Sequence, residues 1–270
     1  MATILDKIVV QTKDDLVRRK QNISFADFNS FEGYEKDRIS FANALQKKGE
    51  VSIISEVKKA SPSKGIIREP FNPVDIALSY EEGGASAISV LTDAPFFKGD
   101  LSYLEAISKR VSLPLLRKDF IIDPFQIKEA RAYGADAVLI IVSITEGDQL
   151  AELLYAAKEF GLDALVECYD QEDFDRVDFD LVDILGVNNR DLRTFDVDVH
   201  RGISILNQSP EGTIKVSESG LSSGRDMALL RDSHIHSALI GEYFMRQRNP
   251  GRAVSELLQA AKAVGERNEL

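Results

Sequence analysis

The sequence of 270 residues has no tryptophan and a single cysteine, Cys168. One cysteine excludes an internal disulfide and is consistent with a reducing compartment. The first fifteen residues, MATILDKIVVQTKDD, carry charges throughout and lack the apolar core of a signal peptide. The longest nearly uncharged apolar run, residues 137–144, is far too short to span a bilayer. We therefore expect a cytoplasmic protein without a membrane partner.

Basic residues are also scarce relative to acidic ones, with 33 lysines and arginines against 44 aspartates and glutamates, for a net charge of −11. A nucleic-acid-binding protein needs a basic face, so nucleic acid is excluded as a main partner. Lysines with a function must then be local concentrations, which suit a small anionic ligand better than a polymer. No apolar stripe suggests a subunit interface, and we expect a monomer.

One unit recurs along the chain, in which a helical segment ends at a glycine and a short apolar run follows. Residues 83–91 (GGASAISVL), 133–142 (YGADAVLIIV) and 160–168 (FGLDALVEC) are three copies. Glycine suits the left-handed conformation at a helix C-terminus, and uninterrupted apolar runs are typical of parallel strands buried on both faces. Eight such runs occur, at 51–58, 86–91, 113–117, 136–142, 163–167, 182–187, 213–217 and 237–240.

Eight strand–helix alternations predict an α/β fold, a (β/α)8 TIM barrel. A doubly wound open sheet is the alternative, but no G-x-G-x-x-G follows the first run. We expect the barrel to occupy residues 49–270 and a helical extension, residues 1–48, to pack on it as part of a single domain. Within the extension, the pattern predicts helices over 4–20 and 34–48.

Charged residues follow several of these runs, at the C-terminal strand ends where barrel enzymes place their active sites. Alternation puts Glu56 and Lys58 on one face of the first strand, toward the barrel mouth. Lys118 follows the third strand, Glu167 ends the fifth, and Asn188 follows the sixth. Lysines and carboxylates close together shift one another's pKa, so this set predicts a catalytic pocket with proton-transfer groups.

Gly220 and Gly241 follow the seventh and eighth strands, where many barrels bind phosphate through backbone N–H groups. Phe97 and Phe120, just beyond the second and third strands, would suit a flat aromatic substrate at the mouth. The pair His234 and His236 has the spacing of metal ligands, but no carboxylate or cysteine cluster completes a site. We therefore expect no metal.

Taken together, these segments resemble the indole-3-glycerol-phosphate synthase family of tryptophan biosynthesis. The matching stretches are SEVKKASPSKG, SVLTDAPFFKGD, LLRKDFIIDPFQI, LVECYD, GVNNRDLRTF, VSESGL and ALIGEYFMR, and the N-terminal ILDKIV segment is similar to the extra helix of that family. The resemblance covers nearly the whole chain. It implies a carbon–carbon lyase, a carboxy-lyase that closes 1-(2-carboxyphenylamino)-1-deoxyribulose 5-phosphate into an indole with release of CO2 and water. The resemblance also implies that no cofactor is needed.

The resemblance also implies roles for individual residues. Lys118 would be the general acid in ring closure, Glu167 the acid or base in the loss of water, and Lys58 a contact of the substrate anions. The implied catalytic residues are Glu56, Lys58, Lys118, Glu167, Asn188 and Ser219. The implied substrate-binding residues are Ser61, Phe97, Phe120, Leu139, Arg190, Leu192, Gly220, Gly241 and Glu242. Tyr243 and Phe244 depart from the smaller residues usual in the family and would narrow the phosphate loop.

Three other functions are weighed against this one. Phosphoribosylanthranilate isomerase resembles the chain in fold but uses a cysteine at strand 1, where this sequence has none. A Schiff-base aldolase is compatible with the lysines alone. A non-catalytic barrel scaffold would be expected to have lost Lys118 or Glu167, and both are present.

Overall fold

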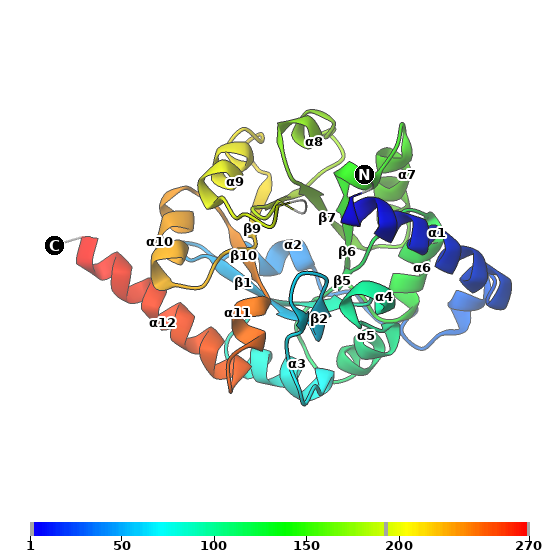
Figure 1. Cartoon of the computed structure of the whole chain (residues 1–270), viewed down its shortest axis with the longest axis horizontal. Coiled ribbons are helices and arrows are strands. Elements are labelled where there is room, and N and C mark those ends of the chain that lie inside the picture. Colours follow the sequence, from blue (N-terminus) through cyan, green and yellow to red (C-terminus); the bar gives the residue numbers. More distant parts are fainter. Residues whose placement is uncertain (1–2, 192–193, 269–270) are drawn as a thin grey trace.

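The computed structural model describes residues 3–191 and 194–268 and contains a closed barrel of eight parallel strands (Figure 1). The strands are β1 (Ser52–Val57), β4 (Ala87–Leu91), β5 (Leu115–Lys118), β6 (Ala137–Ile141), β7 (Asp163–Cys168), β8 (Ile184–Asn188), β9 (Ile214–Glu218) and β10 (Ser237–Ile240). Neighbours in sequence are neighbours in space, and β10 pairs with β1 to close the barrel. Each strand falls within or beside a predicted apolar run, so the predicted TIM barrel is confirmed.

Helices follow the strands and surround the barrel (Figure 1). They are α3 (Pro73–Glu82), α4 (Ala94–Phe97), α5 (Leu101–Ser108), α6 (Pro124–Ala132), α7 (Gln149–Glu159), α8 (Gln171–Asp175), α9 (Val199–Leu206), α10 (Gly224–Asp232), α11 (Glu242–Met245) and α12 (Pro250–Asn268), with a 3-10 turn, η2 (Val142–Ile144), after β6. Many begin at a side-chain cap, as at Asp123 and Ser223, whose oxygens accept N–H groups of the first turn. Gly134 and Gly161 have φ of +87° and +64°, the left-handed conformation expected between helix and strand.

Alternating residues of each strand pack into two separate apolar layers. In β1, Ile53 and Val57 pack outward against the helices, whereas Ile54 packs inside the barrel. Cys168 at the end of β7 is a buried thiol in the outer layer, as its position after Glu167 predicts. The same alternation turns Glu56 inward at the strand end, so the barrel core continues directly into charged groups at its mouth.

The N-terminal extension reaches both ends of the barrel. Helix α1 (Ile4–Asn22) lies beside α6 and α7 in Figure 1, and Arg19 and Lys20 form ion pairs of 2.7 Å with Glu129 and Asp123 of the α6 region. A 3-10 turn, η1 (Asp27–Ser30), and α2 (Phe41–Ala44) follow. Helix α1 confirms the prediction over 4–20.

The predicted helix over 34–48 is wrong, because only Phe41–Ala44 is helical. Two backbone N–H groups and the Arg38 side chain of this segment bind groups at the N-terminal strand ends. Ile39 N–H donates to Asp136 Oδ1 at 2.9 Å, and Ala42 N–H donates to Asp163 Oδ2 at 3.0 Å. Arg38 donates to the carbonyl of Ala135 at 2.6 Å. These long-range partners replace the i→i−4 bonds of a helix and hold the segment under the barrel.

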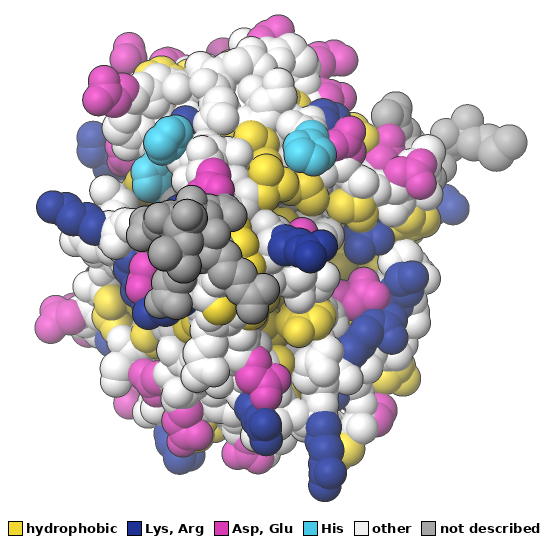
Figure 2. Space-filling view, turned by 90° about the vertical axis from the view of Figure 1, so that its left-hand side faces the viewer, with side chains coloured by type: hydrophobic (Ala, Val, Ile, Leu, Met, Phe, Trp, Pro, Cys, Tyr) yellow, Lys and Arg dark blue, Asp and Glu magenta, His cyan; other side chains and the backbone are white. Residues whose placement is uncertain are grey.

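No helix in the described residues is long and apolar enough to cross a membrane. On the face shown in Figure 2, basic and acidic side chains are intermixed and do not form a patch of one sign. This face therefore does not supply the predicted local concentration of cations.

Candidate active site

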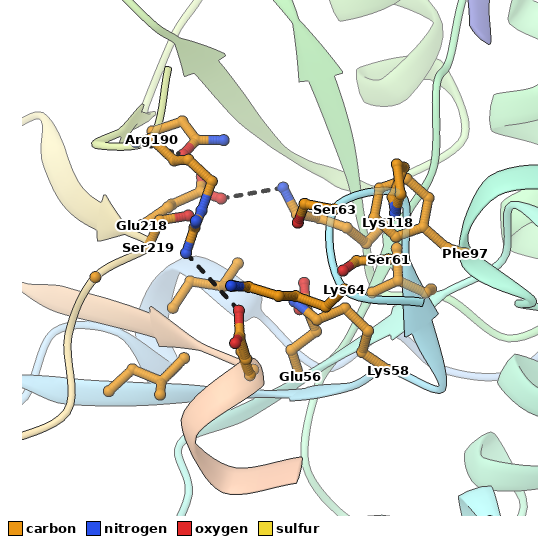
Figure 3. Close-up of a pocket in the computed structure, with 18 of the residues that line it drawn as sticks. Glu56, Lys58, Ser61, Ser63, Lys64, Phe97, Lys118, Arg190, Glu218 and Ser219 are labelled. Carbon is orange, nitrogen blue, oxygen red and sulfur yellow. Dashed lines mark hydrogen bonds and ion pairs between the residues drawn. The ribbon is translucent and has the colours of Figure 1, made fainter. Parts of the chain in front are cut away.

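A cavity of about 420 Å³ opens at the C-terminal ends of the strands (Figure 3). It brings together the predicted site residues Glu56, Lys58, Ser61, Phe97, Lys118, Phe120, Leu139, Glu167, Asn188, Arg190, Ser219, Gly220, Gly241 and Glu242. The remaining predicted residue, Leu192, lies outside the described residues. The cavity lies at the end of the barrel where active sites of this fold occur, and its size suits a small-molecule substrate.

Lys118 stands at the centre of the polar groups. Its Nζ lies 2.6 Å from Glu167 Oε2 and 3.0 Å from Glu218 Oε2, so one ammonium contacts two carboxyl groups from different strands. All three side chains are at least four-fifths buried. Asn188 Nδ2 contacts the other oxygen of Glu167 at 3.4 Å and orients that carboxylate. The arrangement places one hydrogen-bond donor, the Lys118 ammonium, against oxygens of two carboxyl groups.

The protonation of this cluster follows from burial and charge. Burial lowers the pKa of Lys118, but the charges of Glu167 and Glu218 outweigh this effect and hold its pKa above the usual range. Burial raises the pKa of Glu167, and the neighbouring Lys118 more than compensates, so the pKa of Glu167 is lowered. Burial raises the pKa of Glu218 to about 8, helped by the charge of Glu167. Near neutral pH the cluster thus holds an ammonium, a carboxylate and a carboxylic acid.

Two glycines make room for the interior carboxyl groups. A Cβ at Gly186 of β8 would lie 2.5 Å from Glu218 Oε1, and a Cβ at Gly241 would fall on Glu56 Oε1. Glu56 in turn forms an ion pair with Lys58, which agrees with the prediction that both lie on one face toward the barrel mouth. Both glycines have negative φ, which other residues can also adopt. They are therefore needed for the space that a side chain occupies, and not for their backbone conformation.

One end of the cavity is apolar. Phe97 and Phe120 lie with ring centroids 6.0 Å apart, and Leu139 of β6 lines the same cavity. Ile4 and Ile8 of α1 also line it, so the N-terminal extension forms part of the wall. The Asp93 carboxylate accepts the N–H groups of Phe96 and Phe97 and starts the short helix that carries Phe97. This end could hold a flat aromatic ring.

The opposite side carries groups suited to an anion. Ser219 and Gly220 after β9 have φ of +72° and +80°, a succession that turns the chain sharply at the mouth. Arg190 enters from the loop after β8, and its guanidinium lies 3.8 Å from Glu242. Ser61 comes from a two-stranded hairpin, β2 (Ala60–Ser61) and β3 (Gly65–Ile66), in the loop after β1. Backbone turns and a guanidinium can bind a phosphate.

The sequence reasoning missed several residues that line the cavity. The most important is Glu218, although alternation with the interior residues Ile214 and Val216 indicates that it faces inward. Lys64 and Phe195 are loop residues, for which periodicity gives no signal. Of the two unusual residues after Glu242, Tyr243 lines the cavity. Its neighbour, Phe244, is buried against Tyr80 with ring centroids 5.9 Å apart.

Comparison with known proteins places this site in a family. A solved structure of a mutant tryptophan synthase α-subunit from Pyrococcus furiosus matches with a TM-score of 0.60 over 81% of this chain and 99% of that one, at 11% identity, which supports the fold alone. Proteins described as indole-3-glycerol phosphate synthase are 48% identical in Salinibacter ruber, over 97% of both chains, and 45% identical in Campylobacter jejuni, over 94% of this chain and 100% of the relative. The family model described as indole-3-glycerol phosphate synthase matches residues 5–257. The chain therefore belongs to the indole-3-glycerol phosphate synthase family.

Proposed function

We propose that this chain catalyses the reaction of its family in tryptophan biosynthesis, as a carboxy-lyase that forms indole-3-glycerol phosphate. The substrate, 1-(2-carboxyphenylamino)-1-deoxyribulose 5-phosphate, is closed to the indole with loss of one CO2 and one water. The observation that carries this assignment is the Lys118 ammonium held between Glu167 and Glu218, with an aromatic wall on one side and cations on the other.

Ring closure requires a proton donor at the ketone. The arene is a poor nucleophile, so the carbonyl oxygen must be protonated or polarised as the new carbon–carbon bond forms. Lys118 is suited to this step because its raised pKa keeps it protonated at neutral pH. Once the new bond has broken the aromaticity of the ring, the carbon–carboxylate bond breaks and its electrons pass to the adjacent iminium, which releases CO2.

Loss of water then requires a base and an acid. Glu167 is ionised and lies against Lys118, so we assign it the removal of the proton from the ring-closed intermediate. The departing hydroxyl leaves as water after it accepts a proton from the cluster. The second carboxyl group beside Lys118 is that of Glu218, which is protonated and therefore neutral near neutral pH. We assign it the positioning of Lys118.

The two ends of the cavity match the two ends of this substrate. Phe97, Phe120 and Leu139 would pack on the aminobenzoate ring. Lys58 and Arg190 supply charge for the substrate anions, and Ser219 and Gly220 supply the turn near the phosphate. The remaining predicted site residues keep the roles inferred from the family resemblance, and those roles stay predictions.

A Schiff-base aldolase is disfavoured by the same geometry. Attack on a carbonyl by lysine requires a neutral amine, whereas Lys118 is paired with two carboxyl groups and Lys58 with Glu56. Borohydride trapping with substrate would reveal a Schiff base. Phosphoribosylanthranilate isomerase is disfavoured because strand β1 (Ser52–Val57) contains Glu56 and no cysteine, and Lys58 follows directly after it.

Other expectations stay predictions. We propose that the enzyme acts as a monomer in the cytoplasm, needs no cofactor, and forms one folded domain from the extension and the barrel. The intermixed charges of Figure 2 and the net charge of −11 support a small anionic substrate over a nucleic acid. Light scattering of the purified protein would measure its oligomeric state.

The direct test of the proposed function is product identification. Purified protein is incubated with synthetic substrate, the indole product is followed by its fluorescence and identified by mass spectrometry, and CO2 is measured in parallel. We expect one CO2 for each indole formed. Well-folded protein that forms no indole would overturn the proposed function.

A further inference from the structure

Lys64 differs from the other cations of the cavity in having no acidic partner within residues 3–191 and 194–268. Five cations and five acidic residues line the cavity; the cations are Lys58, Lys64, Lys118, Arg190 and Arg246. Lys58 pairs with Glu56, Lys118 with Glu167 and Glu218, and Arg190 and Arg246 both with Glu242. Asp119, the fifth acidic residue, pairs with Arg117 behind the cavity wall. Among the described residues, Lys64 alone of the five makes no ion pair.

Backbone hydrogen bonds of the β2–β3 hairpin fix the loop that carries Lys64, whose exposed side chain lines the cavity. Lys64 N–H donates to the Ser61 carbonyl at 3.3 Å, which closes a turn with Pro62 at its second position. The hairpin that flanks the turn pairs Ala60 with Ile66, and Ile67 N–H donates to the Lys59 carbonyl at 2.8 Å. The backbone position of Lys64 is therefore set by the hairpin.

The side chains of Lys64 and Arg190 approach the cavity from opposite sides. Figure 3 shows Lys64 extending from the hairpin across the opening, toward the side from which Arg190 enters. Arg190 has two long contacts. Its Nη1 donates to the Phe195 carbonyl at 3.4 Å, and its 3.8 Å separation from Glu242 exceeds hydrogen-bond distance, while Glu242 also has Arg246 at 3.0 Å. Arg190 can thus turn to a new anion without leaving Glu242 unpaired.

We propose that Lys64 binds the phosphate group of the substrate together with Arg190, and so closes the anion end of the site. The proposal rests on the proposed function for its substrate, a sugar phosphate. A dianion that enters this end meets Lys64 and Arg190 from two sides, next to the turn at Ser219 and Gly220. Because the phosphate takes no part in bond making or breaking, we expect its contact with Lys64 to be as strong in the ground state as in the transition state, so that Lys64 contributes to substrate binding and not to the chemical step.

The test compares Lys64→Ala, Lys64→Arg and Lys59→Ala. Lys59 is a matched control, since it lies in the same loop but outside the cavity lining and 3.9 Å from Glu69. For Lys64→Ala we expect KM to rise about tenfold with kcat within about twofold, which is the pattern for loss of uniform binding. Lys64→Arg should restore KM to within about threefold, and Lys59→Ala should match the wild type.

Calorimetric titration with inorganic phosphate gives a readout that does not depend on turnover. We expect Lys64→Ala to weaken phosphate binding by about the same factor as KM, and Lys59→Ala to leave it unchanged. Equal phosphate affinity in wild type and Lys64→Ala, or a lowered kcat at unchanged KM, would overturn the proposal. If the wild type forms no indole, the proposed function fails, and the phosphate titration still decides whether Lys64 belongs to an anion site.

Discussion

Replacement of Glu218 by glutamine tests whether the Glu218 carboxyl group, beside Lys118 and Glu167, is the group that holds a proton near neutral pH. The carboxyl group has a pKa raised from 4.5 to about 8, because it is buried beside the ionised Glu167. Its Oε1 is buried without a hydrogen-bond partner in the described part of the chain, as suits a neutral acid more than a carboxylate. Glutamine keeps the size of the side chain and removes the titration.

The sign of the effect follows from the direction of the shift. Since the folded pKa of Glu218 exceeds its unfolded value, folding takes up a proton between the two values. The stability that this proton contributes is complete below the unfolded pKa and is lost as the pH rises through about 8. One pKa unit corresponds to about 1.4 kcal/mol, so the whole shift gives an upper limit of about 5 kcal/mol. Structural relaxation around Lys118 reduces this upper limit, and we expect the free energy of unfolding to lose about 2 kcal/mol or more as the Glu218 proton is released.

The assay is urea unfolding followed by circular dichroism at several pH values from 5 to 9. The free energy of unfolding of the wild type should fall over this range relative to that of Glu218→Gln. Glu211→Gln, which replaces an exposed acid, is the control and should follow the wild type. Parallel pH profiles for wild type and Glu218→Gln would refute the assignment of the proton to Glu218.

Two further predictions concern groups behind the site. Arg117→Met should lower the free energy of unfolding by about 3 kcal/mol, because fully buried Arg117 lies 2.9 Å from Glu129 and its loss leaves buried charge behind. The exposed control Arg252→Met should cost less than about 0.5 kcal/mol in the same urea titration. Gly186→Ala should displace the Glu218 carboxyl, lower kcat, and destabilise the fold by about 1–3 kcal/mol of overpacking. Wild-type kcat and stability in Gly186→Ala would show that the carboxyl group has room to move without consequence.

The barrel could be predicted from the sequence because its signals are local. Apolar runs after glycines such as Gly134 and Gly161 mark the parallel strands. Alternation along the first strand predicted that Glu56 and Lys58 face the barrel mouth, and both line the cavity there. The segment 34–48 could not be predicted this way. Its backbone partners, among them Asp136, lie about a hundred residues away, and propensity does not report them.

The site residues likewise include some that local sequence signals predict and others that depend on contacts distant in the sequence. Residues at strand ends, such as Lys118 and Glu167, follow from strand position and fold. Glu218 was within reach of the alternation argument, whereas the coupling of its carboxyl group to Glu167 through Lys118 depends on distances across the barrel. The place of Lys64 depends on a hairpin turn, and its lack of an acidic partner in the described part of the chain appears only when the ion pairs of the other cavity cations are known.

The central claim is that Lys118 and Glu167 carry out the acid–base chemistry of indole formation. It is tested most directly by turnover of Lys118→Ala and Glu167→Gln with synthetic substrate, alongside calorimetric substrate binding for each variant. We predict that each variant binds substrate and loses about two or more orders of magnitude in kcat, as expected for loss of general acid–base groups. Near-normal kcat in both variants would contradict the account.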